Sequence, residues 1–117
     1  MNRLAAEALG RRAETIAAWW LRLQGYRILG QRVRNPRGEI DIVARRGGVV
    51  AFVEVKARAS TQGLDSAIDD YRFRRVAAAA EVAIPYYCGE RFDARFDIIL
   101  VAPGRLPRHM RNVWHAR

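Results

Sequence analysis

The residues best suited to chemistry are four charged side chains that lie in two short apolar runs. Glu39 and Asp41 are two residues apart in GEIDIVA, and Glu54 and Lys56 are two residues apart in FVEVKA. Residues two apart in a β-strand point to the same face, so each pair shares a face if both runs are strands. Gly47-Gly48 lies between the runs and favours a two-residue hairpin turn. Counting outward from that turn places Asp41 opposite Glu54, and Glu39 opposite Lys56.

Two carboxylates that face each other across adjacent strands require a counterion. The β-carbons of directly opposed residues are about 5 Å apart, and like charges at that separation destabilise a sheet. A divalent cation would compensate Asp41 and Glu54, because Mg²⁺ binds carboxylate oxygens together with water and substrate phosphate. The alternative is a set of cross-strand ion pairs on a solvated face, with Lys56 neutralising Glu39 and Glu54. The apolar residues around the four charges favour a functional site, because a charge in a central strand is costly unless it is paired or used.

Lys56 also stands out by composition. It is the only lysine in a chain with 21 lysine and arginine residues. A bias towards arginine explains most of this pattern. An amine is nevertheless a compact charge with a tunable pKa, which a guanidinium is not, so Lys56 is a candidate for chemistry that arginine cannot perform.

The elements that would position these residues follow from the spacing of apolar side chains. Residues 3–24 predict a first helix that ends at Gly25, with Trp20 in the core, and its buried stripe is Leu9, Ala13, Ile16, Ala17, Trp20 and Leu21. Residues 26–34, 39–45 and 49–57 predict three antiparallel strands in a meander. A second helix is predicted over about residues 64–84, ending before Pro85, and residues 96–102 predict a buried strand. This order of elements predicts a single α/β (α+β) domain over residues 1–117.

The charge balance points to polyanionic partners. The formal net charge is +9, so the field around the protein attracts nucleic acid, with anionic membrane surfaces as the second candidate. A high net charge also keeps a domain soluble without any such partner, so the charge alone does not assign a function.

The remaining composition indicates a reducing compartment. Cys88 is the single cysteine, which excludes an internal disulfide and a cysteine zinc site and makes a structural thiol the simpler interpretation. The N-terminal residues mix charges with apolar side chains, so we expect neither a signal peptide nor a membrane span. We therefore expect a cytoplasmic protein.

Three further polar residues are interpreted as structural or peripheral. Asp97 begins a buried strand, and we expect it to pair with an arginine such as Arg95 or Arg58. His109 and His115 lie in a weakly specified tail. A histidine metal site needs further ligands at suitable spacing, so we expect both histidines at the surface without a role.

The pattern of acidic residues and lysine resembles a known signature. GEIDIVA followed by FVEVKAR is similar to the restriction-endonuclease-like superfamily, in which an acidic residue on one strand precedes Glu-x-Lys on the next. From about Gly10 to Val101 the chain resembles the bacterial YraN family of predicted endonucleases, which is itself similar to archaeal Holliday junction resolvases. The matching segments are residues 10–14, 25–26, 38–41, 52–58 and 95–97. One departure is Arg72, where members usually carry a lysine; the positive charge is kept, but a proton-transfer role is not.

The resemblance implies a central mixed β-sheet flanked by helices and hydrolysis of phosphodiester bonds with Mg²⁺ or Mn²⁺. Asp41 and Glu54 would be metal ligands, and the Val55 carbonyl would supply a further oxygen. Lys56 would orient the attacking water or help to deprotonate it. Such chemistry is physically sound, because a bound cation lowers the pKa of water and neutralises charge on the phosphate.

Two other acidic residues are less constrained. The resemblance makes Glu14, on the first helix, a third acidic group of the catalytic set; the alternative is a solvated glutamate. Glu39 has no general counterpart in the superfamily, and we expect it to tune Lys56 or to fix the turn. We expect nucleic acid to be bound by Arg37, Arg58, Arg72 and Arg75.

The predicted function is therefore a metal-dependent endonuclease, with DNA, including branched DNA, as the favoured substrate. Two alternatives remain open: a nucleic-acid-binding module without cleavage activity, and a nuclease of the same fold that acts on RNA. No feature of the sequence indicates recognition of the 2′-hydroxyl that distinguishes RNA from DNA. The resemblance to resolvases also makes a homodimer one of the oligomeric states to be tested.

Overall fold

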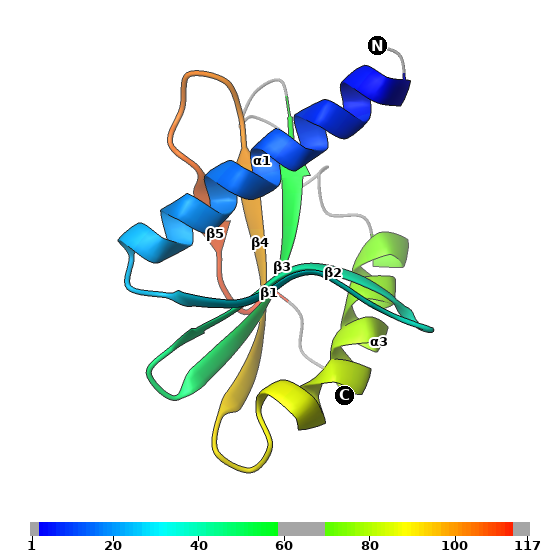
Figure 1. Cartoon of the computed structure of the whole chain (residues 1–117), viewed down its shortest axis with the longest axis vertical. Helices are drawn as coiled ribbons and strands as arrows, with labels where there is room; N and C mark the ends of the chain where they lie inside the picture. Colours follow the sequence, from blue (N-terminus) through cyan, green and yellow to red (C-terminus); the bar gives the residue numbers. More distant parts are fainter. Residues whose placement is uncertain (1–2, 59–69, 114–117) are drawn as a thin grey trace.

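A computed structural model gives the fold for residues 3–58 and 70–113, with side chains described for residues 8–58 and 75–113. Five strands form one sheet in the order β1-β2-β3-β4-β5, and every neighbouring pair is antiparallel except the parallel pair β3–β4 (Figure 1). The predicted mixed sheet flanked by helices is confirmed, while β5 is absent from the sequence prediction. The elements are α1 (Arg3–Leu23), β1 (Arg27–Asn35), β2 (Gly38–Arg46), β3 (Val49–Ala57), α3 (Asp70–Tyr87), β4 (Asp93–Val101) and β5 (Arg108–Met110).

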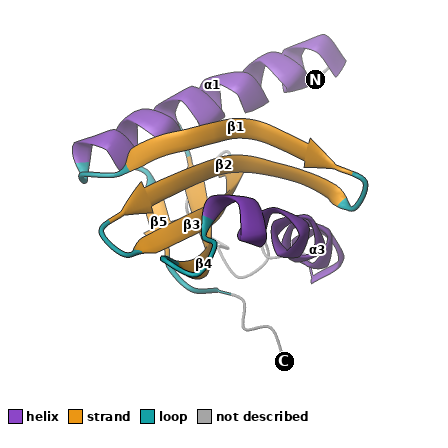
Figure 2. Ribbon diagram, turned by 60° about the horizontal axis from the view of Figure 1, so that its bottom comes forward, coloured by secondary structure: helices purple, strands orange, loops and turns teal. Residues whose placement is uncertain are grey.

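The two helices cover opposite faces of the sheet, as Figure 2 shows. On one face, alanines of α1 and Leu21 pack against Ile42 and other apolar residues of the central strands. On the other face, alanines of α3 pack around Phe52 and Phe96. Small helix residues let both helices lie close to the sheet, so the strands between them are buried on both sides.

Helix α1 agrees with the prediction in its bounds but buries a narrower stripe. Ala13, Ala17 and Leu21 are almost fully buried, and Trp20 packs against the same core as predicted. Leu9 and Ile16 remain 41% and 39% exposed, so their predicted burial is wrong. The buried stripe follows i, i+4 steps through Ala13, Ala17 and Leu21. Ile16 lies beside this line, and Leu9 continues it one turn nearer the N-terminus of the helix. No helix in residues 3–58 and 70–113 is long and apolar enough to cross a membrane.

The hairpin that carries the charged residues forms at Gly47-Gly48, as predicted. Gly47 adopts a φ of 59°, which a two-residue hairpin turn needs and glycine accepts without strain. Backbone pairing runs from Arg46–Val49 to Ile42–Val53. The pairing register predicted by counting from the turn is therefore confirmed over these residues.

The β1–β2 hairpin bends sharply halfway along its length. Ile42 belongs to the core on the α1 face, whereas Ile40, two residues away, belongs to the core on the α3 face. Regular alternation would put both on the same face, so the strand turns over between them. The far end of the hairpin is fixed to α3, where the Asn35 side-chain amide donates to the Ala79 carbonyl at 2.8 Å. Gly38 permits this approach, because a β-carbon there would lie 3.1 Å from the Arg75 carbonyl oxygen.

Helix α3 continues past Pro85, so the predicted end before this residue is wrong. The helix extends to Tyr87, and the Cys88 and Gly89 amides donate to the Ile84 and Pro85 carbonyls. A proline in the last turn removes one hydrogen bond but leaves these later ones intact. Gly89, with a φ of 53°, then ends the helix. Residues 64–69 of the predicted helix lie outside the described residues.

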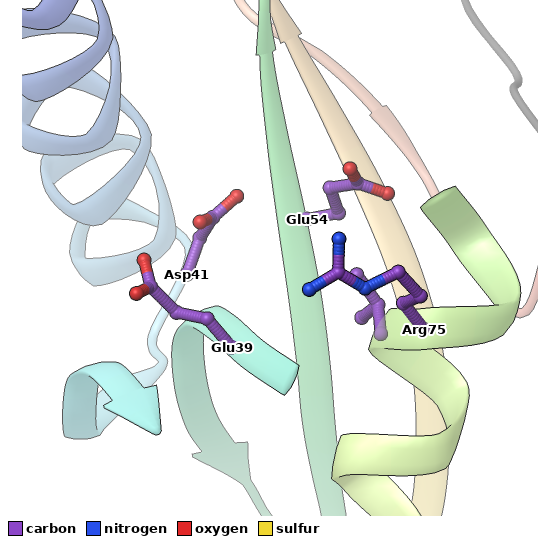
Figure 3. Close-up of a pocket in the computed structure, with 5 residues that line it drawn as sticks. Glu39, Asp41, Glu54 and Arg75 are labelled. Carbon is purple, nitrogen blue, oxygen red and sulfur yellow. The ribbon is translucent and has the colours of Figure 1, made fainter. Parts of the chain in front are cut away.

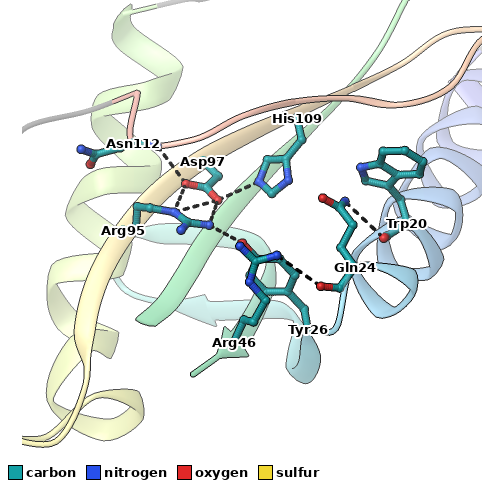
Figure 4. Close-up of polar contacts among 8 residues, drawn as sticks. All are labelled: Trp20, Gln24, Tyr26, Arg46, Arg95, Asp97, His109 and Asn112. Carbon is teal, nitrogen blue, oxygen red and sulfur yellow. Dashed lines mark hydrogen bonds and ion pairs between the residues drawn. The ribbon is translucent and has the colours of Figure 1, made fainter. Parts of the chain in front are cut away.

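A buried polar network joins β4 and β5 on the α1 face of the sheet (Figure 4). Asp97, fully buried, accepts hydrogen bonds from the Arg95 guanidinium at 2.8–3.2 Å, from His109 Nε2 at 2.8 Å and from the Asn112 amide at 3.0 Å. Arg95 also donates to the Tyr26 hydroxyl at 2.6 Å. The predicted Asp97–Arg95 pair is confirmed. The predicted surface position of His109 is wrong, because β5 folds back onto β4 and brings this ring to Asp97; His115 lies outside the described residues.

Replacing Asp97 with asparagine should lower the free energy of unfolding by about 2–4 kcal/mol, because it leaves several buried donors with a weaker acceptor. Burial alone would raise the pKa of Asp97, but the hydrogen bonds from His109, Arg95 and Asn112 outweigh it and hold the pKa below its usual value. The stabilisation from this charge is therefore complete above pH 4 and is lost as the pH falls through the lowered pKa. Urea unfolding at pH 7 measures the effect, and Asp93→Asn, at an exposed position of β4, is the control.

Candidate active site

The candidate site is a cleft of about 170 Å³ at the point where β2 and β3 separate. Backbone pairing ends at Ile42–Val53, because the hairpin bends towards α3 beyond it. Figure 3 shows Glu39 and Asp41 on the β2 side of the cleft and Glu54 and Arg75 on the opposite side. Asp41 and Glu54 thus line one cleft, as predicted.

The predicted pairing of Glu39 with Lys56 is wrong. The β2–β3 ladder that would bring these residues together stops at Ile42, three residues short of Glu39. There the hairpin leaves the plane of the sheet. Glu39 lies in the cleft but contacts Arg34, with Arg34 Nε 2.6 Å from the Glu39 carboxylate. The bend therefore gives Glu39 a partner on its own hairpin.

Asp41 is held by the backbone of the neighbouring strand. Its carboxylate accepts a hydrogen bond from the Val55 amide at 2.7 Å, which takes the place of the next backbone pair. Burial raises the pKa of Asp41 from 3.8 to about 6; the Val55 hydrogen bond opposes this shift, and the charges of Glu14, Glu54 and Glu39 add to it. At neutral pH Asp41 is therefore negatively charged, and the charges of three other carboxylates act on it. This concentration of negative charge favours the binding of a cation.

Glu54 and Lys56 form a buried ion pair. Lys56 Nζ lies 2.8 Å from a Glu54 carboxylate oxygen, and the two side chains are 2% and 4% exposed. Both residues follow Phe52 at two-residue steps, so all three point to the α3 face of β3. Lys56 lies against Glu54 and is not part of the lining of the cleft. Lys56 therefore places a compact positive charge directly against Glu54.

Glu14, on α1, does not line the cleft but forms an ion pair with the hairpin. The Arg32 guanidinium makes two contacts of 3.3 Å with the two Glu14 carboxylate oxygens. The Glu14 side chain is only 16% exposed, and its charge contributes to the raised pKa of Asp41. The alternative of a freely solvated Glu14 therefore does not hold.

The donor set suits a hard divalent cation. The N–H and the carbonyl of one strand residue point to the same side, so the Val55 carbonyl, like its amide, faces the side of β3 where β2 departs. Asp41, Glu54 and this carbonyl would offer three oxygens, and Mg²⁺ commonly takes one or two carboxylates together with water and substrate phosphate. Within the described residues there is no group of three or more histidine, cysteine, aspartate or glutamate side chains arranged to hold a metal ion. A cation here would thus depend on the substrate to complete its ligands.

The predicted nucleic-acid-binding arginines are placed unequally. Arg75, from α3, lines the cleft itself. Arg37 is exposed at the turn of the β1–β2 hairpin, and Arg58 is exposed just after β3, where its guanidinium donates to the Ala57 carbonyl. The Arg72 side chain lies outside the described residues. Arg75 is therefore the arginine best placed to meet a phosphate in the cleft.

Sequence reasoning misses Arg32 and Arg34, which contact Glu14 and Glu39. Both alternate with apolar residues in β1, so the sequence predicts only that they point away from the core. Their partners lie on α1 and beyond the hairpin turn. Gly30, at a β-bulge two residues earlier, marks an irregularity in this strand, but nothing in the sequence marks the left-handed conformation of Arg32 itself.

A larger groove of about 550 Å³ lies between α1 and the loop that joins β4 to β5. Its lining is mainly apolar, with Arg12 and Arg105 as its charged residues. No carboxylate lines this groove within the described part of the chain. The smaller cleft is therefore the candidate active site, because it gathers the titratable groups.

Comparison with known proteins identifies the family of the chain. The model of the uncharacterised protein family UPF0102 matches residues 13–101, a range that contains all the residues lining the cleft. A UPF0102 protein from Sphingopyxis alaskensis is 61% identical over 97% of this chain and 98% of its own length. Another from Rhizorhabdus wittichii is 56% identical over 99% of this chain and 98% of its own, and one from Caulobacter vibrioides is 46% identical over 94% and 89%. The chain belongs to the UPF0102 family.

Proposed function

We propose that this protein is a Mg²⁺- or Mn²⁺-dependent endonuclease of the YraN type, within the restriction-endonuclease-like superfamily. One observation carries the proposal. Asp41 and Glu54, from adjacent strands, line one cleft together with Arg75. Lys56 contacts Glu54 from outside the lining of this cleft. The convergence of Asp41 and Glu54 agrees with the pattern of acidic residues, whereas Lys56 lies outside the lining of the cleft. The mixed sheet with a helix on each face is consistent with that fold.

In this proposal each residue has a distinct role. Asp41, Glu54 and the Val55 carbonyl would hold the cation, which when bound lowers the pKa of water and neutralises charge on the phosphate. Lys56 would orient the attacking water or, once it has released its own proton to solvent, help to deprotonate that water. Arg75 would position the scissile phosphate from the α3 side of the cleft. The Val55 amide keeps the Asp41 carboxylate directed at the site.

The favoured substrate is DNA, including branched DNA. The net charge of +9 and the arginines on the β1–β2 hairpin support binding to a phosphate backbone. The same site would hydrolyse RNA, because none of the described contacts reads a sugar hydroxyl. A homodimer would present two such sites to a branched substrate, and sedimentation equilibrium measures the number of chains.

A cleavage panel tests the proposed activity. It contains linear duplex DNA, single-stranded DNA, a flap, a four-way junction and RNA, each incubated with Mg²⁺, with Mn²⁺ and with EDTA. We expect metal-dependent cleavage that Glu54→Gln abolishes and that Glu90→Gln, at an exposed turn outside the cleft, leaves intact. Binding to the panel without cleavage by the unaltered chain would favour the binding module, and the preferred substrate separates DNA from RNA.

Binding to DNA should weaken steeply with salt, because each phosphate contact releases counterions. With several arginine contacts we expect the affinity for a fluorescent duplex to fall more than tenfold between 50 and 200 mM NaCl, measured by anisotropy in EDTA. Arg75→Ala should reduce the slope of log affinity against log salt concentration by about one, because one phosphate contact is lost. The control is Arg91→Ala, because Arg91 stacks on Phe92 at the opposite end of β3 and β4 from the cleft. An affinity that does not change with salt contradicts the proposed phosphate contacts.

A further inference from the structure

Arg32 has an unusual backbone conformation for a residue in the middle of a strand. Its φ is 51°, in the left-handed region that a residue other than glycine enters only at a cost. Its neighbours Gln31 and Val33 pair regularly with Ile42 and Ile40, so the register places Arg32 opposite Asp41. Strand pairing continues on both sides of Arg32, with a β-bulge at Ile28/Gly30 before it, and a strained residue kept within a strand points to a role for its side chain. Glycine would adopt this φ without strain but would carry no charge.

The Arg32 side chain neutralises Glu14 next to the cleft. The guanidinium meets both carboxylate oxygens at 3.3 Å, which is longer than the 2.7–2.9 Å of a strong charge-assisted bond. Arg32 is 44% exposed, whereas the Glu14 side chain is only 16% exposed. The arginine can therefore move into solvent at little cost, but Glu14 cannot, and it would then need another cation.

The carboxylates around the cleft show why this pair differs from the others. Glu54 is paired with Lys56, which is itself buried, and Glu39 is paired with Arg34 where both side chains are well exposed. Only in the Glu14 pair, among the described ion pairs at the cleft, does an exposed base neutralise a mostly buried acid. Glu14 also acts electrostatically on Asp41. A cation held by Asp41 would therefore act on Glu14 as well.

We propose that Arg32 is an exchangeable counterion for Glu14: it neutralises this carboxylate until a divalent cation does so, and its released guanidinium then binds a phosphate of the substrate. The inference rests on the proposed metal site. It makes Arg32 a positioning residue that links two binding events. By thermodynamic reciprocity, the cation would strengthen the binding of the phosphate backbone, and the phosphate backbone would strengthen the binding of the cation by the same factor.

The test is a double-mutant cycle on Mn²⁺ affinity, measured by calorimetry without nucleic acid on the full chain, Arg32→Gly, Glu14→Gln and the double variant. Arg32→Gly should bind Mn²⁺ about five- to tenfold more tightly than the unaltered chain, because the competing charge is gone and the φ is retained. In the Glu14→Gln background the same change should alter the affinity less than about twofold. Arg27→Ala removes a charge from an exposed position of the same hairpin and is the control, with little change expected.

Each result distinguishes the inference from its alternatives. Weaker Mn²⁺ binding by Arg32→Gly would overturn it, and so would an equal gain in the Glu14→Gln background, which would indicate a general effect of charge. If the folded, unaltered chain binds no Mn²⁺, the proposed metal site fails and the inference fails with it. Arg32→Ala provides a check on folding, because alanine is strained at this φ and should melt several degrees below Arg32→Gly.

Discussion

Replacing Lys56 with arginine should lower metal-dependent cleavage by about 10²- to 10⁴-fold while changing nucleic-acid affinity by less than about threefold. The charge remains, so the electrostatic attraction to phosphate remains. The compact amine, which can approach a water molecule more closely than a guanidinium can, is lost. The loss corresponds to the range that a positioned acid or base contributes to a reaction. Single-turnover cleavage of the preferred substrate of the panel measures it.

The burial of Lys56 makes a second variant necessary. Its side chain is 2% exposed and contacts Glu54 at 2.8 Å, so the larger guanidinium also risks overpacking this region. Lys56→Met has a similar volume and no charge, and it should lose cleavage to at least the same degree while a thermal melt reports whether it folds. Arg75→Lys, the opposite substitution at a residue that lines the cleft, should reduce cleavage much less than Lys56→Arg does. Full activity in a folded Lys56→Arg would show that Lys56 is only a structural partner of Glu54.

The central strands could be predicted from the sequence because their geometry is set locally. The Gly47-Gly48 turn fixes the register of β2 and β3, and the two-residue period of a strand then fixes which side chains share a face. Strand β3 has the predicted bounds, and Asp41 and Glu54 line the same cleft. These parts of the site depend on contacts between residues close in sequence.

The rest of the site depends on contacts that the sequence does not reveal. The change of face between Ile42 and Ile40 brings the hairpin onto α3, far along the chain, and Arg32 with its left-handed conformation lies within this bend. The counterion of Glu14 therefore cannot be predicted from its own helix. The sequence places His109 in a weakly specified tail for a similar reason. Three residue pairs with β4 suffice to form β5, and no periodic pattern marks so short a strand.

Asp41→Asn should make the protein more stable at neutral pH by about 1–3 kcal/mol. Burial and the neighbouring carboxylates raise the pKa of Asp41 from 3.8 to about 6 in the folded protein, so the folded state binds more protons than the unfolded state between these values. Stability from this group is complete below pH 4 and is lost as the pH rises through 6, and two pKa units correspond to about 3 kcal/mol. Asparagine removes the charge and can still accept the hydrogen bond from Val55. Urea unfolding should therefore show a gain at pH 8 that vanishes at pH 4.

The same substitution should abolish the response to divalent cations, and the two effects together identify Asp41 as a residue retained for function. A cation that binds only the folded state adds RT ln(1 + [L]/Kd) to stability, about 2.7 kcal/mol at a concentration of 100 Kd. Mn²⁺ should thus raise the melting temperature of the unaltered chain at pH 8, and much less that of Asp41→Asn, with cleavage by the variant below detection. Asp93→Asn, at the opposite end of β3 and β4, should respond to Mn²⁺ like the unaltered chain. If Asp41→Asn is more stable yet still gains from Mn²⁺ as the parent does, the charge at this position is not the one that holds the cation. A loss of stability in the variant would instead mean that the bond from Val55 to an ionised carboxylate outweighs the repulsion among the acidic residues, and that Asp41 is a structural anchor of the bend.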